Sequence, residues 1–454
     1  TMLPDMLLKI DYGRWMFAII AYYCVMLLAL HAMGDVCVRD AFARTLERVK
    51  TRPFPALVML MYPLAFQPFE DVSINSVTEG LADLVNEGLH LGGGNMRGNR
   101  KAQNSEPAKE KLHIGIFAGI AVLAFLLTAV FYGIGFFPFQ PTHSDGNGYY
   151  MYLPAFFVYH DPGMHFLDQL AEDISGFSGT FFPMDTGQVV DKYTMGVAIL
   201  QLPFFLAADI LTKLFRPEAA DGFSALYQLG NIASGCFYYF FGSFWSYRLA
   251  KKYAGAGKAF AAVLLITFGT GLFHYITMDG SYSHVYTYGM LALFLWLVER
   301  HEEEERTKFK VLGGICFGLV TLIRVTNVVV IFVYLLYRVT SLKSFQERMA
   351  KVFRPKSFLP ILAGFFPVWL PQLIYWKWAA GSFIVNSYDL PGNIWQEHFN
   401  WLQPQIAGVL FLPNRGVFFW CPVVILSCAA FVLCFRRAEN FQLGMLVSVI
   451  LFTY

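Results

Sequence analysis

The chain has 454 residues, of which 56% are hydrophobic, 17% are aromatic and only 15% are charged. Soluble domains carry roughly 25% charged residues, so a chain this apolar must be solvated largely by lipid. The net charge of +2 comes without a basic stripe, which gives no indication of nucleic-acid binding.

Seven cysteines lie mostly inside apolar runs and include no C-x-x-C pair. They predict neither a disulfide framework nor a zinc site. The first apolar run begins near Trp15 and lacks a small-residue cleavage pattern, so no cleavable signal peptide is predicted. Since the sequence stops inside the apolar segment 443–454, we expect the natural protein to continue.

Residues 1–112 are interpreted as a separate, membrane-associated N-terminal extension. The run at 14–34 is long enough to span a bilayer, whereas the run at 53–69 is interrupted by prolines and its topology stays open. Three glycines at 92–94 and the polar stretch 99–111 indicate a linker. The main transmembrane domain is therefore expected over 113–454.

The rest of the chain is a succession of apolar segments. A spanning helix needs about 20 apolar residues. Candidate spans in chain order are 114–138, 226–247, 258–277, 284–299, 309–323, 325–337, 358–376, 417–435 and a segment from about 441. We expect an all-α, polytopic transmembrane protein of about 9–11 spans.

Loop charges assign the two faces of the membrane. The most basic loop contains six cations and one acid, Glu347, and is placed in the cytoplasm. Its cations are Arg338, Lys343, Arg348, Lys351, Arg354 and Lys356. Counting outward from this loop, the segment 139–225 becomes a large first outer loop that carries surface helices. The run at 195–212, interrupted by Pro203 and Asp209, is expected to lie at the outer surface rather than to cross.

Arg324 separates two short apolar runs, 309–323 and 325–337. A single span over 309–337 would hold this guanidinium near the bilayer centre at a cost of roughly 2.5–3.5 kcal/mol. Two short spans that meet at Arg324 avoid this cost and place the residue at the outer face. That face then also receives the loops 278–283 and 377–416.

Unusual polar residues gather on the same predicted face, and each also has a structural interpretation. Asp145 can be a turn former or helix cap. Lys192 and Arg415 can be interfacial anchors. His284 at the start of a span is more often structural than catalytic, whereas Arg324 at membrane depth favours function. One carboxylate with several cations suits a phosphate leaving group and a deprotonated nucleophile.

A metal site is the weaker interpretation of a second polar group. Its residues are His160, Asp161, His165 and Asp168. They have the residue types of metal ligands but lack a helical H-x-x-x-H pattern with a third ligand. No cofactor is predicted with certainty, and a divalent cation stays an open alternative.

The order of these motifs over about 113–435 resembles the GT-C glycosyltransferases. The closest likeness is to the branch of polyprenyl- or dolichyl-phosphate-mannose–protein mannosyltransferases and lipid-A aminoarabinose transferases. The residues that carry it are Asp145 after the first span, Lys192-Tyr193, Ser281-Tyr282-Ser283-His284, Leu322-Ile323-Arg324 and Asn414-Arg415-Gly416-Val417-Phe418. The likeness departs from the family where Gly146 replaces a second acid and Thr194 replaces a proline.

The resemblance implies an inverting transferase that moves a sugar from a polyprenyl-phosphate donor to an acceptor at the outer membrane face. Asp145 would be the general base, and Lys192 with Tyr193 would hold the donor phosphate. His284 is placed with the substrate-binding residues, and topology adds Arg324 and Arg415 as phosphate clamps.

The expected partners are the lipid-linked donor, membrane lipids and a glycan, lipid or protein acceptor, with no nucleic acid. The expected location is a bacterial inner membrane with the site facing the periplasm, as for cell-envelope enzymes; an endoplasmic reticulum location stays open. Two alternatives remain: a transporter or flippase, for which no internal repeat is found, and a non-catalytic binder of lipid-linked sugars.

Overall fold

The computed structural model describes residues 99–135, 140–170, 180–387, 390, 405–412, 416–434 and 440–453. The predicted extension up to residue 98, with its runs at 14–34 and 53–69, lies outside these residues. Within the described residues, three helical segments are long and apolar enough to cross a membrane. They are Lys109–Gly133, Gly196–Phe215 and Pro355–Ala380.

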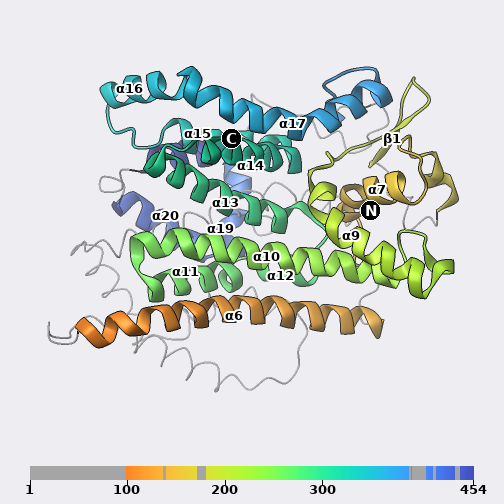
Figure 1. The fold of residues 1–454 in the computed structure, drawn as a ribbon, viewed down its shortest axis with the longest axis horizontal. Helices are drawn as coiled ribbons and strands as arrows, with labels where there is room; N and C mark the ends of the chain where they lie inside the picture. The colour runs from red at the N-terminus through yellow and green to blue at the C-terminus, as the bar shows by residue number, and fades with distance from the viewer. Residues whose placement is uncertain are drawn as a thin grey trace.

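Five long helices run side by side in a single row, seen edge-on in Figure 1. They are α6 (Asn99–Gly133), α10 (Ala225–Ala254), α13 (Ser283–Glu304), α14 (Thr307–Ile323) and α17 (Pro355–Ala380). Each helix of the row contacts the next, from α6 through α10, α13 and α14 to α17. The row therefore follows the order of the chain.

The position of a helix in this row explains its composition. The outermost helix α6 exposes apolar side chains such as Leu123 and Val130, as a lipid-facing surface requires. The central helix α13 is buried along most of its length. Its neighbour α10 buries polar side chains such as Gln228 and Asn231, which find hydrogen-bond partners inside the protein. Polar residues thus gather where protein, not lipid, surrounds the helix.

The predicted spans correspond to observed helices, with two further breaks. The run 258–277 is divided into α11 (Ala256–Gly269) and α12 (Leu272–Thr277). The run 417–435 contains α19 (Val417–Trp420) and α20 (Val423–Cys434). The remaining helices are α16 (Leu342–Val352), α18 (Ile406–Phe411) and α21 (Gln442–Thr453).

The predicted break at Arg324 is present. This residue has extended backbone angles and separates α14 from η3 (Val325–Val330), which leads into α15 (Ile331–Leu335). In Figure 1 the chain runs along α14 to the end of the row that holds α7, and α15 lies back toward the other end. Two short segments therefore meet at Arg324.

The polar stretch 99–111, predicted as a linker, is instead the start of α6. Ala, Lys, Gln and Glu dominate this stretch, and all are good helix formers once an apolar helix continues from them. This part of the predicted linker is therefore helical and continuous with the apolar part of α6.

The large loop before α10 carries α7 (Asp145–Phe157), η1 (His165–Gln169), α9 (Gly196–Phe215) and η2 (Pro217–Ala219). It also contains an unpredicted antiparallel hairpin of β1 (Phe181–Pro183) and β2 (Val189–Asp191), in which Phe181 pairs with Asp191. These elements cluster at one end of the helix row in Figure 1.

Helix α9 lies across this end of the row. Its Gln201 amide donates to Asn231 near the start of α10 and to the Tyr286 hydroxyl near the start of α13, both over 3.0 Å. Gly196, its first residue, packs on Leu322 and Ile323 at the end of α14. Contacts with the same ends of three helices hold α9 at this end of the bundle, although its length and composition would also allow it to cross a membrane.

Candidate functional site

The described candidate residues all lie at the end of the row that holds α7 and the hairpin. Asp145 begins α7, Lys192 and Tyr193 follow β2, His284 is near the start of α13, and Arg324 follows α14. Arg415 lies outside the described residues. Because these elements come from four separate parts of the chain, the fold brings distant motifs to one face.

Arg324 links the break after α14 to the first turns of α7. Its Nε donates a hydrogen bond to the Tyr149 hydroxyl over 2.6 Å, and its Nη2 lies 3.9 Å from Oδ2 of Asp145. The Arg324 side chain is only 8% exposed and that of Asp145 is 16% exposed. A carboxylate and a guanidinium therefore share a partly desolvated position, where charge interactions are stronger than in water.

Glycines allow α7 to approach its neighbours closely. A side chain at Gly146 would collide with the Ser281 hydroxyl, and one at Gly148 would collide with the ring of Tyr193. The segment 144–148 therefore packs directly against the loop before α13 and against the Lys192-Tyr193 pair. Asp145, directly before Gly146, is therefore held close to the first of these contacts.

Lys192 lies beside the same aromatic group. Its Nζ is 5.8 Å from the centre of the Tyr193 ring, and that ring lies 4.2 Å from the ring of Tyr149. The Lys192 backbone carbonyl accepts a hydrogen bond from Ser387 over 2.5 Å. Tyr149 thus contacts both the Arg324 side chain and the Tyr193 ring. It connects the motif that contains Arg324 with the motif that contains Lys192.

Asp191 is a fully buried carboxyl that the candidate set omitted. Its Oδ1 accepts a hydrogen bond from the Tyr193 N–H over 2.8 Å, while its Oδ2 has no hydrogen-bond partner among the described residues. Burial raises the pKa of Asp191 well above its usual range, although the Tyr193 N–H and the Lys192 charge oppose this. The acid directly before the Lys-Tyr pair was visible in the sequence, but its burial was not.

A second omitted group centres on Asp279. Its Oδ1 lies 3.3 Å from His143 Nε2, and its Oδ2 lies 2.9 Å from His274 Nε2. Burial alone would raise the pKa of Asp279, but hydrogen bonds from His143 and His274 outweigh it and hold that pKa well below the usual range. Since His143 is two residues before Asp145, this carboxylate connects the loop before α13 to the start of α7.

His284 belongs to an aromatic contact beside this group. Its ring lies 4.1 Å from the ring of Tyr275, and the side chain is buried. The structure thus brings Asp145, Lys192, Tyr193 and Arg324 into one connected group, and His284 packs on Tyr275 at the same end of the helix row.

His160, Asp161 and His165, which belong to the weaker metal-site interpretation, contact one another or backbone carbonyls. His165 Nδ1 lies 3.0 Å from Asp161 Oδ1, and His165 Nε2 lies 2.9 Å from the Gly187 carbonyl. His160 Nδ1 lies 3.2 Å from the Phe156 carbonyl. Among the described residues, no group of three or more His, Cys, Asp or Glu side chains is arranged to hold a metal ion.

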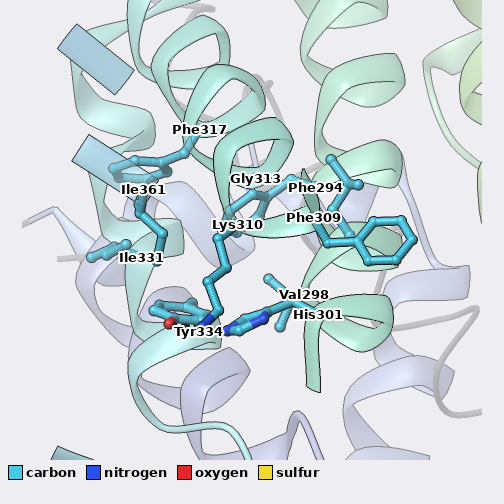
Figure 2. A pocket seen from close by; sticks show the side chains of 11 residues that line it. Phe294, Val298, His301, Phe309, Lys310, Gly313, Phe317, Ile331, Tyr334 and Ile361 are labelled. Carbon is cyan, nitrogen blue, oxygen red and sulfur yellow. Dashed lines mark hydrogen bonds between the residues drawn. The ribbon is translucent and has the colours of Figure 1, made fainter. Parts of the chain in front are cut away.

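Two small cavities lie between the helices. The larger, about 30 Å³, has room for about one water molecule and lies away from the candidate site, where Figure 2 shows Lys310 extending toward His301 and Tyr334. The second, about 10 Å³, is lined partly by Thr128, Asn231 and Ser281. Neither of these two cavities is large enough for a sugar.

No family model, no curated protein sequence and no solved structure matches the chain. The resemblance to GT-C enzymes therefore rests on the motifs of this sequence alone.

Proposed function

We propose that the chain is an inverting glycosyltransferase that uses a polyprenyl-phosphate sugar and acts at the outer face of the membrane. The observation that carries the proposal is the connected group of Asp145, Arg324, Tyr149, Tyr193 and Lys192. It combines one carboxylate with two cations, the set of charges that sugar transfer from a phosphate ester requires.

In the proposed reaction the Asp145 carboxylate takes the proton of the acceptor hydroxyl. The acceptor oxygen forms a bond to the anomeric carbon of the sugar as the bond from that carbon to the phosphate oxygen breaks. The bonding electrons leave with the polyprenyl phosphate, whose charge Arg324 and Lys192 stabilise. Attack opposite to the leaving group inverts the configuration at the anomeric carbon.

The Arg324–Tyr149 hydrogen bond supports this assignment. It fixes one edge of the guanidinium through Nε and leaves the Nη2 edge directed at Asp145. A fixed cation costs little reorganisation when charge develops on the leaving group. Arg324 is thus positioned to bind phosphate beside the base.

The distribution of elements supports an outward-facing site. The end of the row with α7 and α9 holds the candidate residues, whereas α16, from the strongest basic loop, lies at the opposite end (Figure 1). Since basic loops stay in the cytoplasm, the candidate end faces outward. In a bacterium this is the periplasmic face of the inner membrane, with about 9–11 spans.

The test is sugar release or transfer by the purified chain from a panel of radiolabelled polyprenyl-phosphate sugars. Asp145→Asn should lose about 10²–10⁴-fold in turnover, the usual contribution of a general base, while donor binding is retained. Asp185→Asn is the matched control, because Asp185 is exposed in the loop between β1 and β2.

The results separate the proposal from its alternatives. Equal turnover by wild type and Asp145→Asn would remove Asp145 from the mechanism. Donor binding without turnover by wild type, unchanged in Asp145→Asn, would instead identify a non-catalytic binder.

A further inference from the structure

Helix α16 directs Arg348 and Lys351 toward the protein, whereas its Lys343 and Glu347 are exposed. Arg348 is buried, and its Nη1 donates to Glu302 over 2.7 Å while its Nη2 donates to the Tyr334 carbonyl over 2.6 Å. Lys351 pairs with Glu302 over 3.1 Å and with Glu305 over 2.7 Å. These contacts attach one side of α16 to the end of α13 and determine which side remains outside.

The outward side of α16 is an apolar stripe. Leu342 and Phe345 lie one helical turn apart and are 74% and 38% exposed, and Phe353, directly after the helix, is 60% exposed. Phe358 and Leu359 continue the exposed apolar surface at the start of α17. Figure 1 shows α16 continuing nearly in the direction of α17, so the exposed apolar surface extends along one side of the bundle. Apolar side chains of an amphipathic helix are stabilised among lipid chains at a membrane interface.

Positive charge lies beside this stripe. Arg354 and Lys356 are exposed between α16 and the body of α17, and neither forms an ion pair within the described part of the chain. The nearby acids Glu302 and Glu305 are already paired with Arg348 and Lys351. The exposed Glu347 of α16 lies 4.0 Å from Lys343. The local surface therefore carries a surplus of cations that no described carboxylate compensates.

The arrangement is also fixed from inside the bundle. Lys310 of α14 is 9% exposed, and its Nζ donates to the backbone carbonyl of Lys356 over 3.0 Å. This bond holds the start of α17 against α14. The position of Lys356 in the outward surface is therefore determined by buried contacts.

We propose that α16 and the start of α17 form a docking surface for anionic phospholipids of the adjoining leaflet. Leu342, Phe345 and Phe353 enter the acyl region, and Arg354 and Lys356 bind the phosphate headgroups. Each basic residue near an anionic surface strengthens binding to that surface by about fivefold. This inference needs the chain to be in a membrane but is independent of the proposed reaction.

The test uses the full chain in phosphatidylcholine vesicles with a trace of photoreactive phospholipid that carries a diazirine in its acyl chain. The probe is either phosphatidylglycerol or phosphatidylcholine, and labelled peptides are identified by mass spectrometry. The lipid-facing segment of α6 around Leu123 serves as an internal reference. We expect the phosphatidylglycerol probe to label the α16 peptide several-fold more than the phosphatidylcholine probe, and less so at high ionic strength.

Charge variants separate headgroup recognition from simple membrane contact. The double substitution Arg354→Gln/Lys356→Gln should bring the two probes to equal labelling of α16 while α6 labelling is unchanged. The matched control is Lys377→Gln, since Lys377 is exposed at the other end of α17.

Equal labelling of α16 by both probes in the wild type would overturn the selection for anionic lipid. No labelling of α16 by either probe, with α6 labelled, would overturn the docking surface itself and indicate that something other than lipid covers the stripe. Both outcomes are measured on the wild-type protein, so they test the proposal even if a variant does not fold.

Discussion

The Nε atom of Arg324 and the hydroxyl of Tyr149 are hydrogen-bonded over 2.6 Å, although 175 positions separate the two residues in sequence. The bond joins the break after α14 to the second turn of α7. It also orients the cation that the proposed reaction uses on the donor phosphate.

Tyr149→Phe should therefore weaken donor binding without removing a charge. We expect a rise of about tenfold in KM, equivalent to ~1.4 kcal/mol, with a smaller change in kcat. Arg324→Lys retains the charge but lacks the Nε–H, so it should give a similar rise. Steady-state kinetics over a donor concentration series measure both constants. An unchanged KM in both variants would show that the bond has no part in donor binding.

Asp191→Asn should make the stability of the folded protein less sensitive to rising pH. The raised pKa of Asp191 means that the folded state favours its protonated form. Its destabilising contribution therefore begins above the unfolded pKa of about 3.9 and grows as pH rises toward the folded pKa. Because Asn is neutral and can accept the same Tyr193 N–H bond, the variant should gain Tm relative to wild type as pH increases.

Thermal unfolding of purified protein from acidic to neutral pH measures this difference. Asp168→Asn is the control, because that carboxyl is exposed in η1. A constant loss of Tm in Asp191→Asn at every pH would contradict a neutral buried carboxyl.

Asp279→Asn should show the opposite dependence on pH. The pKa of Asp279 is lowered, so its stabilisation is present above the unfolded pKa of about 3.9 and is lost as pH falls toward the folded value. At neutral pH the variant should lose about 1–3 kcal/mol, because the bonds to His143 and His274 are weakened. This loss of stability should shrink at acidic pH. It is measured by thermal unfolding or by hydrogen exchange of the backbone amides of residues 140–145. An equal loss of stability at every pH would contradict a charged carboxylate at Asp279.

Gly196→Ala should destabilise the contact between α9 and α14. A Cβ at this position would collide with the backbone of Leu322 and Ile323, which cannot move as a flexible side chain can. The expected cost is about 1–3 kcal/mol. Gly119→Ala is the matched control, since a Cβ there meets nothing within 4 Å, and it should be neutral or stabilising. Equal unfolding temperatures for the two variants would disprove close packing at Gly196.

Hydropathy and charge predicted the helical segments well, because lipid requires apolar surfaces and expels isolated charges. The break at Arg324 follows from this rule, since a charge within one long span would be costly. The hairpin of β1 and β2 could not be foreseen, as each strand has only three residues and no clear alternation. Short strands depend on tertiary contacts rather than on local pattern.

Some residues of the candidate group could be predicted from the sequence, but none of the contacts between them. Asp145, Lys192 and Arg324 were selected as polar residues at the ends of apolar segments, and the structure places them together. The bridging role of Tyr149 and the pairing of Asp279 with His143 depend on contacts between remote segments, for which one sequence holds no signal. Their chemical roles stay predictions until the Asp145→Asn experiment is done.

The row of long helices has a consequence for how the protein is made. Because α6, α10, α13, α14 and α17 neighbour one another in the order in which they are synthesised, each new helix finds its packing partner already in place. Assembly in the membrane can then proceed from one edge to the other, without long helices waiting for distant partners. Gly196 of α9 meets Leu322 and Ile323 only once α14 is complete, so the face that holds Asp145 and Arg324 forms late in biogenesis, after α6, α10 and α13 have been inserted.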